Sequence, residues 1–122
     1  MPSPAAGGPT ETQTIPTMSK PPKRFRDFIE THREVGDAYK ALGEATKKAG
    51  PLDERTAALV KLGIAIGMKH EGAVHAHARK ARAAGCSDDE LRHAAILATT
   101  TLGFPSMMAA YSWIDDVVGS GG

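Results

Sequence analysis

The stretch AGPLDE, residues 49–54, constrains the fold more than any other feature of the sequence. Gly50 is typical of the position just after a helix, and Pro51 cannot continue a helix because its ring removes an amide donor and clashes with the preceding turn. Asp53 then offers a carboxylate that accepts from the free amides of a new first turn. The stretch therefore predicts the end of one helix and the start of another.

Three later segments carry boundary signals of the same kind. Gly85 follows an alanine-rich stretch and suits the position just after a helix. SDDE, residues 87–90, matches a capping box, in which Ser87 accepts from the amide of Glu90 and the Glu90 side chain reaches back. GFP, residues 103–105, ends the helix that this box begins. The signals predict short helices joined by tight turns.

Apolar residues between these signals follow the spacing of helices, and no strand-like alternation occurs. The N-terminal stripe consists of Phe25, Phe28, Ile29, Val35, Tyr39 and Leu42. We expect Gly36 to bend or break this helix. The segment 57–66 is apolar on most sides, which predicts a central, buried helix that Gly67 interrupts. A last helix carries apolar residues from Met107 to Val118. The expected fold class is therefore all-α, a bundle of about five or six helices.

Composition limits the domain organisation and the classes of partner. Residues 1–22 are rich in Pro, Gly, Ser and Thr, which predicts a disordered tail before a single helical domain over residues 23–118. Fifteen basic and 14 acidic side chains give a net charge of +1, so neither nucleic acid nor a membrane is an expected partner. We find no spanning stretch and expect no secretory signal. Cys86 is the single cysteine, so no disulfide forms within the chain, and we expect a cytoplasmic location.

Three of the five histidines lie in HEGAVHAH, residues 70–77, which raises the possibility of a metal site. HEGAVH has one residue more than the zinc-binding pattern HExxH, so His70 and His75 lie about 140° apart around a helix. His70 and His77 share a face but stand roughly 10 Å apart along the axis. We expect no bound metal, and the weaker candidates for ligands are His70, Glu71 and His75.

The same cluster suits acid/base chemistry. Histidine exchanges a proton near neutral pH, and a carboxylate four residues earlier on a helix can orient it. Glu71 and His75 have this spacing, whereas His77 points to a different side. The alternative is that Glu71 and His75 form only a surface pair worth a few tenths of a kcal/mol.

Two further residues outside this cluster are chemically reactive by type. Cys86 lies beside the start of a predicted helix, where the helix dipole lowers a thiol pKa. Without a second cysteine the chain cannot resolve a sulfenic acid internally. His93 lies on the polar flank of the capping-box helix. An incidental loop thiol and a surface histidine are the alternatives for these two residues.

PLDERTAALVKLGIAIG, residues 51–67, and HAHARKARAAGCSDDELRHAAILATTTLGFPSMMAA, residues 75–110, resemble the carboxymuconolactone decarboxylase and alkylhydroperoxidase-D-like family. The similarity covers a little over half of the chain and includes the order of its parts. It implies an all-α fold that assembles through its helices, often as trimers or hexamers. A homo-oligomer that binds a small-molecule substrate is therefore expected.

The resemblance also indicates which family chemistry this chain retains. Thiol peroxidase members carry Cys-x-x-Cys-x-x-x-His and a preceding glutamate; with their histidine placed on His77, these positions hold His70, Ala73 and Ala58. A dithiol mechanism needs both sulfurs, so a peroxidase-like function lacks its reactive pair. The decarboxylase branch keeps a histidine at the position of His77 and implies no cofactor.

These residues lead to one principal hypothesis and two alternatives. The principal hypothesis is a cofactor-free acid/base enzyme, a decarboxylase-like lyase that acts on a small organic acid or lactone through His77, Glu71 and His75. The first alternative is a peroxidase-like antioxidant protein. The second is a non-catalytic oligomeric protein that binds a partner.

Overall fold

A computed structural model describes residues 22–119 of the chain, and within this range every regular element is a helix. The helices are α1 (Lys23–Thr31), α2 (Arg33–Lys48), α3 (Glu54–Met68), α4 (Glu71–Ala83), α5 (Asp88–Ile96), α6 (Thr99–Leu102) and α7 (Phe104–Gly119). The all-α prediction is confirmed. The disordered tail predicted for residues 1–22 lies outside the described residues, apart from Pro22. None of the described helices is both long enough and apolar enough to cross a membrane.

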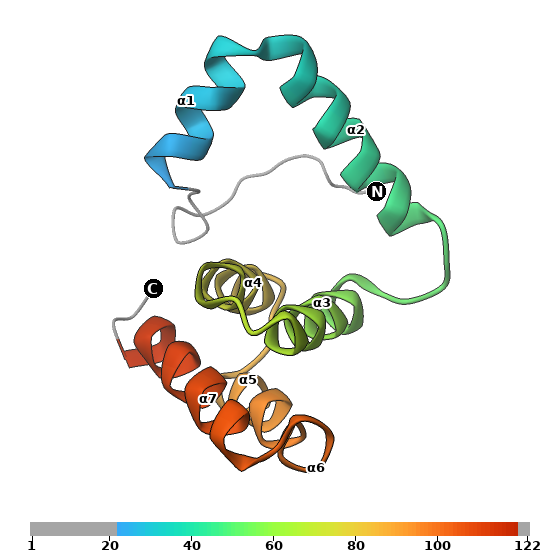
Figure 1. Cartoon of the computed structure of the whole chain (residues 1–122). Coiled ribbons are helices and arrows are strands. Elements are labelled where there is room, and N and C mark those ends of the chain that lie inside the picture. The colour runs from blue at the N-terminus through green and yellow to red at the C-terminus, as the bar shows by residue number, and fades with distance from the viewer. Residues whose placement is uncertain (1–21, 120–122) are drawn as a thin grey trace.

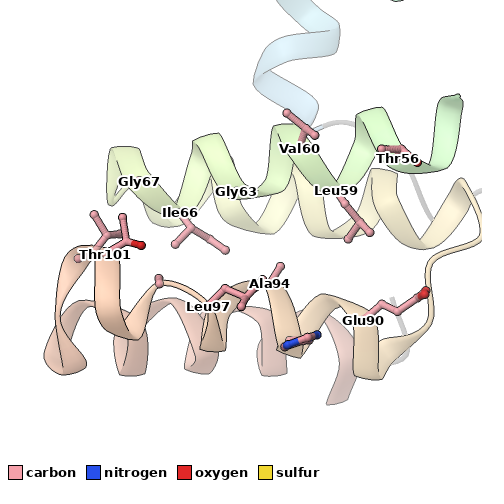
Figure 2. Close-up of a pocket in the computed structure, with 13 residues that line it drawn as sticks. Thr56, Leu59, Val60, Gly63, Ile66, Gly67, Glu90, Ala94, Leu97 and Thr101 are labelled. Carbon is pink, nitrogen blue, oxygen red and sulfur yellow. The ribbon is translucent and has the colours of Figure 1, made fainter. Parts of the chain in front are cut away.

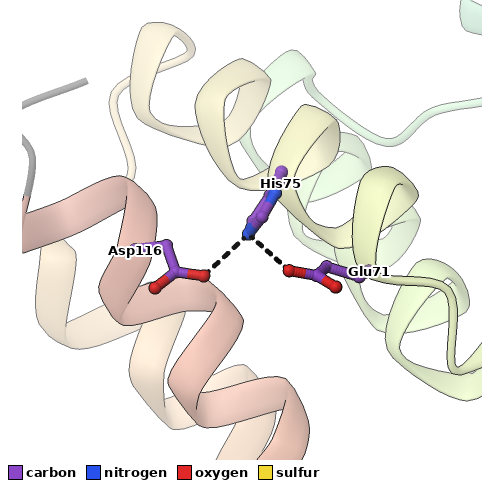
Figure 3. Close-up of side chains that lie close together, drawn as sticks. All are labelled: Glu71, His75 and Asp116. Atoms are coloured by element: carbon purple, nitrogen blue, oxygen red, sulfur yellow. Dashed lines mark hydrogen bonds and ion pairs between the residues drawn. The ribbon is translucent and has the colours of Figure 1, made fainter.

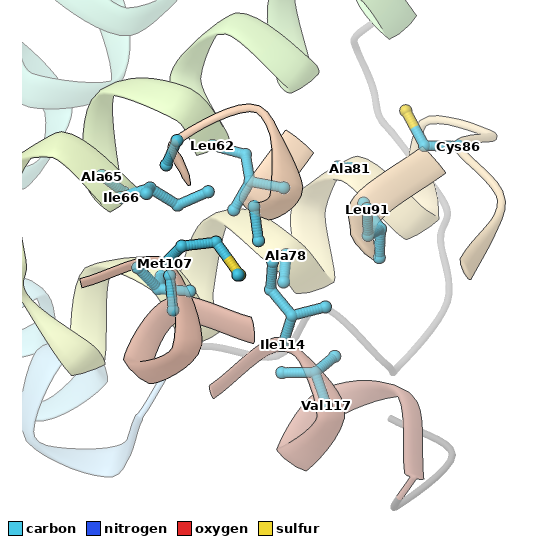
Figure 4. Close-up of a cluster of buried hydrophobic side chains, with 14 residues drawn as sticks. Leu62, Ala65, Ile66, Ala78, Ala81, Cys86, Leu91, Met107, Ile114 and Val117 are labelled. Atoms are coloured by element: carbon cyan, nitrogen blue, oxygen red, sulfur yellow. The ribbon is translucent and has the colours of Figure 1, made fainter. Parts of the chain in front are cut away.

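Helices α3 to α7, which we call the body, enclose the buried core (Figure 1). α4 packs between α3 and α7, and α5 also packs against α7. The largest fully buried side chains are Leu62, Val74, Leu91 and Ile114, one from each of α3, α4, α5 and α7. Figure 4 labels Leu62, Leu91 and Ile114 within this core. On α4 the remaining buried residues are alanines, and these small side chains let neighbouring helices approach closely.

The predicted helix boundaries at Asp53, Gly85 and Ser87 are confirmed. Asp53 Oδ1 accepts from the amide of Thr56 at 2.8 Å. Ser87 Oγ accepts from the amide of Glu90 at 3.1 Å, and Glu90 Oε1 accepts from the amide of Ser87 at 2.8 Å, which completes the capping box. Gly85 has a φ of +102°, and the amide of Cys86 donates back into the last turn of α4. These boundaries fix the turns on both sides of α4.

Two glycines do not break helices as expected. The chain leaves helical geometry at His32, and Gly36 lies inside α2, buried against α1. A Cβ on Gly36 would lie 2.7 Å from Ile29 Cγ2, so glycine permits this close approach. α3 also continues through Gly67 and ends at Lys69, whose φ of +57° turns the chain toward α4. The break at His32 and the short α6 raise the helix number above the expected five or six.

Helices α1 and α2 form a hairpin, which we call the arm, that extends away from the body (Figure 1). The two helices pack on each other, with Phe25 and Tyr39 in an edge-to-face contact at 6.2 Å between ring centroids. Gly36 is the single buried residue among the described residues of the arm. The arm therefore has almost no core of its own.

The prediction that α3 is a central, buried helix is wrong for the isolated chain. α3 buries Leu62, Ala65 and Ile66 against the body, but Ile64 and Met68 remain 59% and 61% exposed. α4 instead occupies the position between two helices. The apolar residues on most sides of α3 predict contacts on more than one face of this helix. They do not indicate that the rest of the same chain leaves one of these faces exposed.

Candidate functional site

The site is built around α4, and its first residue is held by a tight turn. Lys69 in the left-handed conformation leads into His70, the N-cap of α4. The Nδ1 atom of His70 accepts from the amide of Ala73 at 3.0 Å. His70 thus occupies the capping position usually filled by Ser, Thr, Asp or Asn. This contact uses one ring nitrogen of His70 to fix the start of the helix that carries the other candidate residues.

On the flank of α4 that faces α7, Glu71 and His75 meet Asp116 (Figure 3). His75 Nε2 lies 3.0 Å from Asp116 Oδ2 and 3.9 Å from Glu71 Oε2. The His75 side chain is 25% exposed, whereas both carboxylates are more than half exposed. One donor atom from each residue lies within 4.8 Å of the others, a spacing at which the three residues could share a cation. We call these three residues the acidic triad.

His77 lies on the opposite flank of α4, about 200° around the helix from His75. Its imidazole is half-buried, and its charged neighbours are Lys80, one turn later, and Lys61 on α3. Burial lowers the pKa of His77 below its usual value, and the positive charges of Lys80 and Lys61 lower it further. We call His77, Lys61 and Lys80 the basic flank.

Lys80 shows the same electrostatic crowding within the basic flank. Burial lowers the pKa of Lys80, and so do the charges of Lys61, Lys47 and Arg79. Although the surface of Lys80 reaches solvent, its neighbours are cations from three different helices. A positive cluster of this kind favours an anion beside a histidine that is held neutral.

The structure therefore brings two of the three predicted catalytic residues together and separates the third. Glu71 and His75 are in contact, but within one chain His77 faces the other way. Sequence reasoning missed Asp116 and also the two lysines of the basic flank. Asp116 is 41 residues from His75, and nothing in helical spacing relates positions that far apart.

The family model of the carboxymuconolactone decarboxylase family matches residues 33–116, which is more than half of the chain. The chain belongs to the carboxymuconolactone decarboxylase family. The matched segment runs from the start of α2 to the Asp116 carboxylate on α7, so it includes both flanks of α4. A search of curated proteins and a search of solved structures each found no match.

For a member of the carboxymuconolactone decarboxylase family, this chain has little capacity for thiol chemistry. Cys86 is only 6% exposed, and its Sγ donates to the carbonyl of Arg55 at 3.7 Å. Burial raises the pKa of Cys86, and the nearby charge of Arg55 opposes this shift only in part. The lowered thiol pKa expected at a helix start is therefore not found. A protonated, buried thiol is a poor nucleophile.

A groove with a volume of about 550 Å³ runs between α3 on one side and α5 and α6 on the other (Figure 2). Its lining includes the small residues Gly63, Gly67, Ala94 and Ala98. Glu90, which is paired with Arg55, and His93 supply its polar end. His93 thus lines a groove rather than a featureless surface, which sequence position alone did not indicate.

Proposed function

We propose that this member of the carboxymuconolactone decarboxylase family is a cofactor-free acid/base enzyme of the lyase type that acts on a small organic acid or lactone. The observation that carries the proposal is the half-buried imidazole of His77 beside Lys61 and Lys80. A neutral imidazole accepts a proton, and two adjacent cations attract a carboxylate and stabilise negative charge that develops on the substrate.

The charges of the basic flank also support a specific order of proton transfers in the proposed reaction. A carboxylate bound between Lys61 and Lys80 offsets the positive charge that lowers the pKa of His77, so the imidazole gains a proton when the substrate binds. When the carbon–carbon bond to the departing CO₂ breaks, its electron pair remains on the substrate. The imidazolium of His77 then supplies the proton that ends on that carbon.

Glu71 and His75 are the second part of the proposal. Asp116 holds the His75 imidazole in one orientation through the 3.0 Å contact, and Glu71 lies at the edge of the same group. This arrangement supports a second proton-transfer group on the other flank of α4. The merely structural alternative is that the triad only joins α4 to α7.

Single-histidine variants test which flank carries the chemistry. With carboxylated lactones as the substrate panel and CO₂ release as the readout, His77→Ala is expected to lower kcat/KM at least about a hundredfold. His75→Ala is expected to have a smaller effect, and His32→Ala, which changes a histidine in the arm, serves as the matched control. Circular dichroism checks that each variant keeps its helices. Wild-type turnover in His77→Ala would exclude this residue as the proton-transfer group.

We further propose that the protein forms a homo-oligomer, a trimer or hexamer. The support is the large apolar surface that a single chain leaves in water: Phe25, Phe28, Val35, Tyr39, Leu42, Val60, Ile64, Met68, Ile96, Leu97, Phe104 and Met108 are each more than two-fifths exposed. Several of these residues follow helical spacing on one face of α2 and one face of α3, and single soluble chains rarely expose large apolar patches. Light scattering after size-exclusion chromatography measures the mass, and a monomer at micromolar concentration would contradict the proposal.

A further inference from the structure

One face of α2 is apolar and largely exposed, although Tyr39 on this face also contacts Phe25 of α1. Val35, Ala38, Tyr39, Leu42 and Gly43 follow the spacing i, i+3, i+4, i+7 and i+8, and these five residues define the arm face. Val35, Tyr39 and Leu42 are 55%, 61% and 61% exposed. A Cβ on Gly43 would meet nothing within 4 Å, so this glycine leaves an open notch between the larger side chains.

α3 presents a second uncovered face with the same spacing. Val60, Gly63, Ile64, Gly67 and Met68 define the α3 face. Val60, Gly63 and Gly67 of this face also line the groove (Figure 2). Glycine inside a helix costs about 1 kcal/mol relative to alanine, yet a Cβ on Gly63 or Gly67 would meet nothing within 4 Å. Within one chain these two glycines have no packing function. They would have one if another helix lay close against them.

The two faces are complementary in the size of their side chains. The arm face offers Tyr39 and Leu42 as large residues, and the α3 face offers hollows at Gly63 and Gly67. In the other direction, Ile64 of the α3 face matches the small residues of the arm face. Neither face contains a charged residue, so contact between them would not bury an ionised group without a partner. Packed helices insert large side chains of one into hollows of the other.

We propose that α2 of one chain packs on the α3 face of a second copy, so that two chains exchange arms. Among the proposed oligomers, this exchange fits a hexamer built from twofold pairs, in which each arm lies on the α3 face of its partner and the contact forms twice. A second copy is the occupant that the structure favours because the main contacts of the arm are between its own two helices, and α2, which precedes the connection at Pro51, extends away from α3 (Figure 1). The inference rests on the proposed self-association and specifies its surfaces.

Cross-linking between differently tagged chains tests this pairing. Both chains carry Cys86→Ser; one also carries Gly43→Cys and the other Gly63→Cys. A bis-maleimide that spans the about 8–10 Å between packed helix axes is expected to give a product containing both tags. In the matched control, Asp37→Cys replaces Gly43→Cys, because Asp37 lies on the side of α2 opposite the arm face, and the mixed product is expected to fall at least tenfold.

Other cross-linking outcomes overturn the inference in distinguishable ways. A product between two Gly43→Cys chains without the mixed product would show that arms pair with arms. A chain that carries both cysteines and forms only an internal link at low concentration would show that the arm folds back on its own α3. An oligomer without the mixed product leaves self-association standing and removes the arm exchange. A monomer in light scattering removes both, while CO₂ release still tests the enzymatic proposal separately.

Charge variants give a second, independent test. Leu42→Glu in the arm face and Gly63→Glu in the α3 face are each expected to weaken association at least tenfold, because a carboxylate would be buried without a partner. Lys40→Glu is the control, since it changes the charge of α2 on its solvent side. Glutamate is a better helix former than glycine, so Gly63→Glu keeps α3 folded, as circular dichroism checks. Unchanged mass in both variants contradicts the inference.

Discussion

His75 on α4 and Asp116 on α7 lie 41 residues apart in the sequence, yet His75 Nε2 and Asp116 Oδ2 are 3.0 Å apart. The neighbouring residue, Asp115, makes a different connection: its Oδ1 accepts from Arg92 Nε on α5 at 3.0 Å. Two consecutive carboxylates on α7 thus join this helix to two different helices. The pair of contacts fixes the rotation of α7 about its axis and, with it, the position of the acidic triad.

The acidic triad gives the first prediction, which concerns metal. Two of its three side chains are more than half exposed, and strong transition-metal sites hold their ligands with further hydrogen bonds. We therefore expect protein purified without a histidine tag to contain less than about 0.1 equivalent of any transition metal by elemental analysis. About one equivalent, lost in both His75→Ala and Asp116→Asn, would instead identify the triad as a metal site.

The second prediction concerns the titration of His77. Because burial, Lys80 and Lys61 lower its pKa, we expect the NMR signal of its Cε1 proton to titrate with a midpoint below 6.5. Lys80→Met and Lys61→Met should each move the midpoint upward, although burial, the largest cause, remains. Lys40→Met, which removes a lysine from the arm, is the control and should leave the midpoint unchanged.

The lowered pKa of His77 also determines how the free energy of unfolding depends on pH. Since folding lowers the pKa of His77, the unfolded chain takes up this proton first as the pH falls. The contribution of His77 to the free energy of unfolding is therefore present above pH 6.5 and is lost as the pH falls through the folded-state pKa. The measurement is the free energy of unfolding in urea between pH 7.5 and about 5. In His77→Gln this free energy should fall less with decreasing pH than in the wild type, because the titrating imidazole is gone. An unchanged pH profile would contradict the assignment.

The third prediction concerns Cys86. Its burial and raised pKa should make alkylation by iodoacetamide at least about tenfold slower than that of a cysteine placed at the exposed Ser112 in a Cys86→Ser background. Unfolding in urea should abolish this protection. Cys86→Ser should also leave the consumption of peroxide unchanged. A large loss of peroxide consumption in that variant would restore the thiol peroxidase alternative.

The fourth prediction compares two isoleucines in different surroundings. Ile114 is fully buried in the body, so Ile114→Ala should lower the free energy of unfolding by about 2–5 kcal/mol in urea denaturation. Ile64 is 59% exposed in the single chain, so Ile64→Ala should cost less than about 1 kcal/mol in dilute solution. The cost at Ile64 should rise with protein concentration if the α3 face is an interface. A constant, small cost would argue that the face stays open.

Helix boundaries could be predicted from the sequence because their causes are local. The caps at Asp53 and Ser87 and the turn at Gly85 each depend on residues within about one helical turn, and all three predictions are confirmed. The sequence predicts a break at Gly36, whereas the break lies at His32. That glycine has a packing role against Ile29, which lies on a different helix and leaves no local signal.

The site could be predicted only where its contacts are also local. Glu71 and His75 are four residues apart on one helix, and their proximity is confirmed. Asp116 and Lys61 reach α4 from other helices, so their positions follow from packing and not from spacing. In the same way, the apolar pattern of α3 indicates how much of the helix needs covering. The pattern does not indicate whether the residues that pack on α3 come from the same chain or from a second copy.

The arm has one buried residue, Gly36, whereas the body has a continuous core. With so little internal stabilisation, a two-helix hairpin in water is marginal by itself. If partner surface supplies what the arm lacks, its order becomes a bimolecular property governed by mass action, while the body unfolds as a unimolecular unit. Dilution would then unfold the arm, about a fifth of the chain, under conditions in which the body stays folded.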